Sequence, residues 1–171
     1  MPRYYTIASS SLAHPKDLTI AISLSRYEVN LPDGAQTRDG LVSGYLEDIA
    51  NEWLAKDGKM EVSTLCFVKE SNFVMPNSHD VPILMVGPGT GLVPFIGFMQ
   101  EREKARTDSG NELALGPAHL YFGCRRHDVD FIYRDEMHQM KDQGIISELN
   151  CAFSRPVEEG AQKTYVQDVL A

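Results

Sequence analysis

Apolar residues are spaced differently in the two halves of the chain. In the first half they occupy every second position from Leu18 to Leu24, which is typical of a strand with one buried face. Tyr4–Ser9 before this segment and Glu61–Val68 after it are also predicted to be strands. Asn30–Gly40 is rich in Pro, Gly, Asn and Asp and is predicted to be a loop. The first half therefore predicts an antiparallel β-sheet or half of a barrel.

A helix interrupts these predicted strands. Apolar residues recur at helical spacing from Leu46 to Leu54, and Gly58 lies just beyond them as a stop signal. The composition then shifts around Phe73–Asp80, and we place a domain boundary near Ser78. The predicted domains are residues 1–78 and residues 79–171.

The second half alternates strand and helix patterns. In chain order, the predicted elements are Ile83–Val86, Phe95–Lys104, Ala118–Phe122, Tyr133–Lys141 and Leu149–Phe153. Short connections between such elements imply parallel strands joined by right-handed crossovers. Ligands of such sheets bind at the carboxyl ends of the strands. The residues that follow each strand are therefore the candidate binding residues.

Glycines follow the first strand of this half. Gly87, Gly89 and Gly91 surround Thr90, and Pro94 then lies where a first helical turn tolerates proline. A strand, a glycine loop and a helix bring backbone N–H groups and a positive helix end up to a phosphate. The third glycine comes one residue earlier than in GxGxxG, and the absence of a Lys–Ser/Thr pair excludes a nucleoside-triphosphate P-loop. We predict a phosphate-binding turn for a dinucleotide; an ordinary tight turn is the alternative.

Cationic and hydroxyl side chains follow the other two strands. Arg125–Arg126 come after the middle strand, and Ser154 and Arg155 come after the last, with Lys163 and Tyr165 soon afterwards. A bare ribose 2′-hydroxyl usually meets Asp or Glu, whereas a 2′-phosphate requires cationic and hydroxyl donors. This set favours NADP over NAD. The alternative is that these cations are solvated surface charges.

Composition narrows the classes of partner. A formal net charge of −8 argues against nucleic acid and anionic membranes, which attract basic surfaces. Cys66, Cys124 and Cys151 are far apart and are predicted to be reduced, and the histidines do not pair at ligand spacing, so no metal site is predicted. No apolar run approaches the roughly 20 residues of a membrane span, so we expect a soluble chain without membrane contact.

Five segments resemble the motifs of one family. RYYTIASSS resembles its FAD-binding RxYS motif and GLVSGYL its FAD-diphosphate motif, whereas GPGTGLVPFIGFMQER, YFGCRRHDVDFIYRDEM and AFSR…KTYVQ resemble successive NADPH-binding motifs. The chain thus resembles the NADPH-dependent flavin reductases of the ferredoxin–NADP reductase superfamily, more narrowly the diflavin reductases, and most of all the NADPH–cytochrome P-450 reductases. The resemblance implies a partial antiparallel FAD-binding barrel followed by a parallel α/β NADP-binding domain, truncated at both ends.

The resemblance assigns FAD binding to residues of the first half. These are Arg3, Tyr4, Tyr5, Thr6, Ala21, Ile22, Ser23, Tyr27, Gly40, Leu41, Val42 and Ser43. It implies that Arg3 contacts an FAD phosphate and that Thr6 hydrogen-bonds near flavin N5, the hydride-accepting atom. Thr6, the candidate catalytic residue, stands where the family usually has serine, and its additional methyl group could alter the hydride-transfer geometry.

The residues and the resemblance together give the NADPH-binding set. It consists of Gly87, Gly89, Thr90, Arg125, Ser154, Arg155, Lys163, Tyr165 and Gln167. In the family's pattern, Thr90 would contact the pyrophosphate, and the residues from Ser154 to Gln167 would hold the 2′-phosphate and adenosine. Cys124 belongs to the YFGC motif and is predicted to pack at a strand end.

The implied activity is hydride transfer from NADPH to FAD. Electrons would then pass through FMN, in a domain outside this chain, to a haem or flavin acceptor protein such as a cytochrome P-450. Diflavin reductases that serve sulfite reductase, methionine synthase or nitric oxide synthase remain alternatives. So does a nucleotide-binding module without turnover, because the family's nicotinamide-side cysteine, acidic residue and terminal aromatic are missing. We expect the cytoplasmic side as the location, and leave open an endoplasmic-reticulum anchor in the parent protein.

Overall fold

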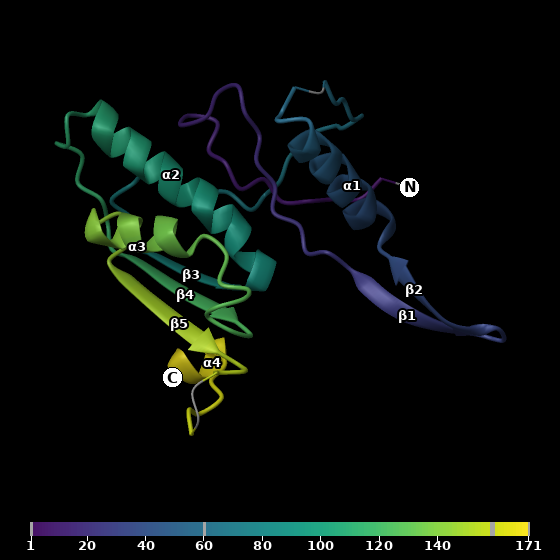
Figure 1. Ribbon diagram of the computed structural model, residues 1–171. Coiled ribbons are helices and arrows are strands. Elements are labelled where there is room, and N and C mark those ends of the chain that lie inside the picture. The colour runs from purple at the N-terminus through teal and green to yellow at the C-terminus, as the bar shows by residue number, and fades with distance from the viewer. Residues whose placement is uncertain (1, 60, 158–159, 171) are drawn as a thin grey trace. The chain divides into compact units, whose positions relative to one another are not determined.

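The computed structural model describes residues 2–59, 61–157 and 160–170 (Figure 1). The chain divides into two compact units. The first unit contains the residues up to Tyr5 and Ile22–Val74, and the second contains Thr6–Ala21 and the chain from Met75 onward. The predicted domain boundary near Ser78 stays a prediction, and each unit is described by itself below.

The first unit contains an antiparallel hairpin and a helix. Strands β1 (Arg26–Leu31) and β2 (Gly34–Asp39) pair in a register that leaves a two-residue turn between Leu31 and Gly34. The prediction that Asn30–Gly40 is a loop was wrong. Only Pro32 and Asp33 make the turn, and Gly34 and the residues after it form β2 because β1 satisfies their backbone groups.

Helix α1 (Leu41–Ala55) confirms the helix predicted around Leu46–Leu54. It ends near Gly58, which has a positive φ of 72° and donates its N–H to the carbonyl of Trp53 at 3.0 Å. That conformation is the left-handed one that stops a helix at glycine.

Three other strand predictions were wrong. Glu61–Val68 contains no strand, and the segments Tyr4–Ser9 and Leu18–Leu24 contribute only the isolated antiparallel bridge between Ile7 and Ile20. Alternation indicates which side chains could share a buried face, but a strand also needs a neighbour for its backbone groups. Beyond the Ile7–Ile20 bridge, none of the described segments provides one, and a barrel is not formed by the described residues.

The second unit is built on a parallel sheet in the order β3-β4-β5. Its elements are β3 (Ile83–Pro88), the 3-10 turn η1 (Gly89–Leu92), α2 (Val93–Asp108), β4 (Ala118–Cys124), α3 (Arg134–Asp142), β5 (Glu148–Phe153) and α4 (Val166–Val169). The predicted strand–helix–strand–helix–strand order and its parallel pairing are confirmed. Helices α2 and α3 lie on one face of the sheet (Figure 1).

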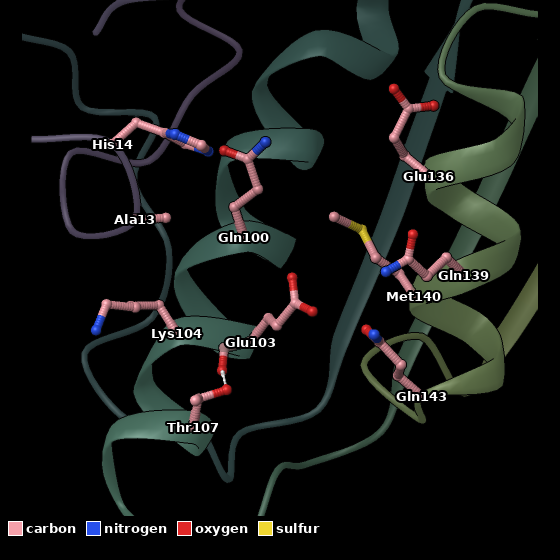
Figure 2. A pocket seen from close by; sticks show the side chains of 10 residues that line it. All are labelled: Ala13, His14, Gln100, Glu103, Lys104, Thr107, Glu136, Gln139, Met140 and Gln143. Carbon is pink, nitrogen blue, oxygen red and sulfur yellow. Dashed lines mark hydrogen bonds between the residues drawn. The ribbon is translucent and has the colours of Figure 1, made fainter. Parts of the chain in front are cut away.

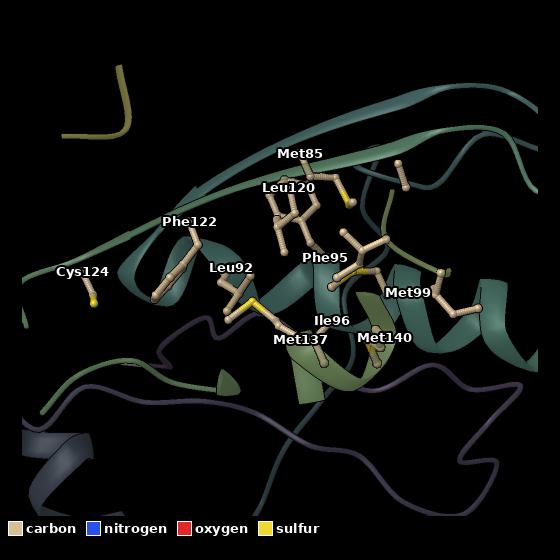
Figure 3. Close-up of a cluster of buried hydrophobic side chains, with 13 residues drawn as sticks. Met85, Leu92, Phe95, Ile96, Met99, Leu120, Phe122, Cys124, Met137 and Met140 are labelled. Atoms are coloured by element: carbon tan, nitrogen blue, oxygen red, sulfur yellow. The ribbon is translucent and has the colours of Figure 1, made fainter. Parts of the chain in front are cut away.

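The core of this unit lies between the sheet and these two helices (Figure 3). Its buried side chains include Met85, Leu120 and Phe122 from the strands, Phe95, Ile96 and Met99 from α2, and Met137 and Met140 from α3. Cys124 belongs to the same core, which confirms its predicted packing role, and burial raises the pKa of its thiol to about 11. Such a thiol is a poor nucleophile near neutral pH.

Residues Thr6–Ala21 form a closed loop that belongs to the second unit, and we name it the Thr6–Ala21 loop. The Ile7–Ile20 bridge closes it, and the N–H of Ala8 donates to the carbonyl of Thr19 at 2.8 Å. Ala8 and Ser10 are buried. The period-2 pattern of this segment therefore ends in a packed loop rather than in a sheet.

Candidate nucleotide-binding site

The glycine loop connects β3 to α2 in a tight turn. A Cβ atom on Gly87 would lie 2.7 Å from the carbonyl oxygen of Gly91, so only glycine fits at this position. Gly89 has a φ of 56°, in the left-handed region that favours glycine. Leu92, at the usual position of the third dinucleotide-binding glycine, is completely buried in the core. The third glycine, Gly91, therefore comes one residue earlier than in GxGxxG because the usual glycine position is occupied by Leu92, which packs in the core.

The other strands end at the same edge as this loop. Pro88 pairs with Gly123 in the register of β3 and β4, and Cys124 pairs with Phe153 in that of β4 and β5. Backbone hydrogen bonding continues past the strands, since the N–H of Arg155 donates to the carbonyl of Arg125 at 2.8 Å. The structure therefore brings the glycine loop, Arg125 and Arg155 to the carboxyl edge of one sheet.

The chain returns to this edge before α4. The N–H of Thr164 donates to the carbonyl of Phe153 at 3.0 Å, and Lys163 Nζ lies 4.7 Å from the centre of the Tyr165 ring. Val166 is buried, and a Cβ atom on Gly123 would lie 2.4 Å from its Cγ2. The packing of α4 against β4 and the Thr164 hydrogen bond to β5 thus place Lys163 and Tyr165 beside the end of β5, which Ser154 and Arg155 follow.

The side chains that gather here suit a phosphorylated ligand. Arg155, Lys163, Tyr165 and Gln167 are exposed, and Ser154 is partly exposed. Guanidinium, ammonium and hydroxyl groups are the donors that bind phosphate. This donor set at the end of a parallel sheet, beside a glycine loop with a left-handed residue, fits the 2′-phosphate and pyrophosphate of NADPH. The individual binding roles stay predictions.

The loop after β4 contains an aspartate that sequence reasoning missed. Asp130 accepts hydrogen bonds from the backbone N–H of Arg125 at 3.1 Å, from Arg125 Nε at 3.0 Å and from the backbone N–H of Arg126 at 2.7 Å. Arg126 pairs separately with Asp128. Burial raises the pKa of Asp130, but the hydrogen bonds from Arg126 and Arg125 outweigh it and hold that pKa below its ordinary value. Asp130 therefore fixes the conformation of this loop at the sheet edge.

The candidates for FAD binding are divided between the units. Thr6 and Ala21 belong to the second unit, whereas Arg3, Tyr4, Tyr5, Ile22, Ser23, Tyr27 and Gly40–Ser43 belong to the first. Within the first unit, Tyr4 packs edge-on against Phe67, with the ring centres 6.0 Å apart. The exposed side chains include Arg3, Tyr4, Tyr5, Ser23, Tyr27 and Leu41.

The start of α1 is organised by Ser43. Its buried hydroxyl accepts the N–H of Ser25 at 3.3 Å and donates to the carbonyl of Gly40 at 3.4 Å. A Cβ atom on Gly40 would lie 2.6 Å from the same hydroxyl oxygen. Ser43 thus joins the start of α1 to the segment before β1. The binding of an anion at this helix end stays a prediction.

Comparison with known proteins decides the family. The model of the oxidoreductase NAD-binding domain family matches residues 85–171, which include the glycine loop, the strands β4 and β5, and α4. The chain belongs to this family. The matched residues include nearly all of the sheet edge described above.

Relatives of this NAD-binding domain protein match it over nearly its whole length. It is 42% identical to NADPH–cytochrome P450 reductase of Cavia porcellus over 98% of this chain, and 40% identical to NADPH-dependent diflavin oxidoreductase 1 of Dictyostelium discoideum over 99%. The bifunctional cytochrome P450/NADPH–P450 reductase of Bacillus cereus is 42% identical over 99% of the chain. The predicted resemblance to the diflavin reductases is therefore confirmed. The chain spans 23%, 25% and 14% of the lengths of these relatives.

The described residues of the chain contain neither a membrane-spanning helix nor a metal-binding cluster. Among its described helices, none combines the length and apolar character needed to cross a membrane. The residues in the described ranges contain no group of three or more His, Cys, Asp or Glu side chains arranged to hold a metal ion.

We expect Asp130→Asn to destabilise the NAD-binding domain protein at neutral pH by about 1–2 kcal/mol, because hydrogen bonds to a carboxylate are lost. The pKa of Asp130 is lowered by folding, so its stabilising contribution is present above its ordinary pKa of 3.8 and is lost as the pH falls through the folded-state value. The variant should therefore lose less stability on acidification than the parent. Urea denaturation followed by circular dichroism, repeated from about pH 7 to pH 3, measures both effects.

Asp128→Asn is the matched control for this prediction. Asp128 is exposed and forms a surface ion pair with the side chain of Arg126, so its loss should change stability little. Equal stability of Asp130→Asn and Asp128→Asn at every pH would contradict the role given to Asp130.

Proposed function

We propose that this chain is the FAD- and NADPH-binding part of an NADPH-dependent flavoprotein reductase. The reaction is hydride transfer from NADPH to FAD, followed by electron transfer through FMN to a haem protein such as a cytochrome P-450. The observation that carries the proposal is the sheet edge where the glycine loop meets Arg125, Arg155 and the returning segment with Lys163. The names of the relatives, which include NADPH–P450 reductases, support the acceptor class.

The residues of this chain would bind and orient the two cofactors. When bound, NADPH supplies a hydride and FAD accepts it, so the protein contributes position and electrostatics. The glycine loop and the start of α2 would hold the pyrophosphate, while Arg155 and Lys163 would hold the 2′-phosphate. The first unit would contribute the flavin side as part of a barrel completed outside this chain, and Thr6 would hydrogen-bond near flavin N5. No side chain needs to act as a nucleophile.

The identity of the electron acceptor is the most specific part of this proposal. A cytochrome P-450, reached through an FMN domain outside the chain, is favoured because the relatives named above include P450 reductases from an animal and a bacterium. A flavoprotein subunit for sulfite reductase, methionine synthase or nitric oxide synthase is the alternative within this enzyme class. The proposal places the parent protein on the cytoplasmic side, and any anchor in the endoplasmic-reticulum membrane outside this chain.

A nucleotide-binding module without turnover is the second candidate. It is favoured by the exposure of the flavin-side residues Tyr4, Tyr27 and Leu41 and by the lack of a barrel among the described residues. A module would bind NADPH but hold FAD weakly. A purified chain that is yellow with stoichiometric flavin, and that loses its oxidised-flavin absorbance on addition of NADPH, would favour the reductase over the module.

Comparing NADPH with NADH tests the nucleotide site directly. We expect isothermal titration of the chain to give an NADPH affinity at least about tenfold higher than that for NADH, because each charge-assisted hydrogen bond to the 2′-phosphate contributes roughly 1.5–3 kcal/mol. Binding of NADPH as weak as that of NADH would remove the case for a 2′-phosphate site and for an NADPH-dependent enzyme.

A further inference from the structure

The Thr6–Ala21 loop carries two flavin-side candidates at its base. The Ile7–Ile20 bridge closes the loop, and Thr6 and Ala21 are the residues just outside that bridge. Antiparallel pairing at the bridge places them on neighbouring chain segments. Inside the loop, the hydroxyl of Ser9 accepts the N–H of Thr19 at 3.0 Å. Hydrogen bonds within the loop therefore hold its base closed. The position of the whole loop in the second unit depends on its contacts with other elements.

Helix α2 provides that contact. The side-chain oxygen of Gln100 accepts the N–H of Ser10 at 3.0 Å, and the hydroxyl of Ser10 lies 3.5 Å from a carboxylate oxygen of Glu101. A Cβ atom on Gly97 would lie 3.4 Å from the carbonyl oxygen of Ala8. Residues further along the loop, Ala13 and His14, line a pocket together with Gln100 (Figure 2). The loop thus packs on the face of α2 that presents Gly97 and Gln100.

The same helix begins at the glycine loop. Gly97 and Gln100 come four and seven residues after Val93, the first residue of α2, which corresponds to roughly 6 and 10 Å along the axis at 1.5 Å per residue. One rigid helix therefore contacts both the phosphate-binding turn and the segment that carries Thr6. A change in how the loop packs on α2 would move Thr6 relative to the nucleotide without changing the glycine loop.

We propose that Gln100 and Gly97 are positioning residues for hydride transfer. By fixing the Thr6–Ala21 loop on α2, they set the distance between Thr6 and the nucleotide that binds at the start of the same helix. This inference rests on the proposed function, in which Thr6 hydrogen-bonds beside the hydride acceptor. It adds that two positions on α2, four and seven residues after the first residue of the helix, determine the transfer geometry. Transfer rates are sensitive to such geometry, because a displacement of 1 Å can cost about a hundredfold.

The test compares Gln100→Ala, Gln100→Glu and Gln139→Ala in the full chain. Glutamate keeps an oxygen that can accept the Ser10 N–H, whereas alanine does not. Gln139 is an exposed glutamine that lines the same pocket from α3, so it is the matched control. Amide hydrogen exchange of Ser10 and Ala8 reports whether the loop stays packed. Stopped-flow loss of oxidised-flavin absorbance, with saturating FAD and NADPH, reports hydride transfer.

We expect Gln100→Ala to speed exchange of the Ser10 amide about tenfold and to slow hydride transfer about tenfold, with NADPH affinity within about twofold of the parent. Gln100→Glu should restore both values to within about threefold, and Gln139→Ala should leave both unchanged. Gly97→Leu should also slow transfer, because a Cβ atom at this position already reaches van der Waals contact with the Ala8 carbonyl oxygen at 3.4 Å and a larger side chain would push the loop away.

The outcomes separate this inference from the function on which it rests. Unchanged exchange at Ser10 in Gln100→Ala, or faster exchange with unchanged hydride transfer, would overturn the positioning role alone. A parent chain that binds NADPH but shows no NADPH-dependent flavin reduction would favour the nucleotide-binding module over the reductase and would remove the positioning role with it.

Discussion

Gly87→Ala is expected to destabilise the second unit by about 2–3 kcal/mol and to weaken NADPH binding more than about tenfold. The new Cβ atom would lie 2.7 Å from the Gly91 carbonyl oxygen and 2.8 Å from Leu92 Cα. These are backbone atoms, and Leu92 is fixed in the core, so the turn cannot yield by rotating a side chain. The strain would have to open the loop that brings the start of α2 to the sheet edge.

Amide hydrogen exchange of β4, the central strand, measures this loss of stability in the second unit. Gly91→Ala is the matched control, because its Cβ atom would meet only Pro88 Cδ at an ordinary 3.7 Å and its φ is not in the left-handed region. It should change the exchange of β4 little. Similar stabilities for the two variants would show that the tight contact at Gly87 does not constrain the loop.

Arg155→Ala is expected to lower NADPH affinity by about 10–100-fold and to leave NADH affinity within about twofold of the parent. Arg155 is exposed, but its backbone N–H is bonded to Arg125, so its position at the sheet edge is fixed. A guanidinium that binds a 2′-phosphate gives affinity only to the nucleotide that has one. The preference for NADPH should therefore disappear, and in the parent it should shrink as salt concentration rises.

Isothermal titration with both nucleotides measures this preference. Lys104→Ala makes the same change in net charge in the C-terminal half of α2, where Lys104 pairs with Asp108. It should leave the ratio of the two affinities unchanged. If Arg155→Ala lowered both affinities equally, Arg155 would contribute general electrostatic attraction or stability rather than recognition of the 2′-phosphate.

The parallel sheet could be predicted from the sequence because its signals are local. Continuous apolar runs such as Ile83–Val86 mark the strands, and apolar residues at helical spacing mark the helices between them. The position of candidate residues after each strand then follows from parallel topology alone. Arg125 and Arg155 were therefore expected at one edge, and the strand register places them there.

In the first half of the chain, the hydrophobic pattern alone did not predict the strands correctly. The alternating pattern at Leu18–Leu24 was predicted to be a strand, yet most of it pairs with no neighbour, and Ile20 alone bridges to Ile7. The hairpin formed by β1 and β2 was not predicted, because its strands are largely polar and exposed. Strand formation depends on the partner that satisfies the backbone groups, and hydrophobic patterning within one segment does not contain that information.

The residues that hold the loops at the candidate site in place also show no local sequence pattern. Ser10 and Gln100 are 90 positions apart, and nothing near either one indicates their hydrogen bond. The role of Asp130 could not be predicted either, because an aspartate five residues after an arginine could equally well face solvent. Packing geometry selects these contacts from many that composition allows.

The sequence by itself determined the parallel strand–helix order, the glycine turn and the family, because each depends on residue types at short spacing. Only the tertiary structure decided that Thr6–Ala21 packs on α2, that Asp130 holds the loop after β4, and that Lys163 returns to the end of β5. These arrangements depend on backbone and side-chain groups that meet across long stretches of chain. Their partners are chosen by close packing and by the need of each buried polar group for a hydrogen bond.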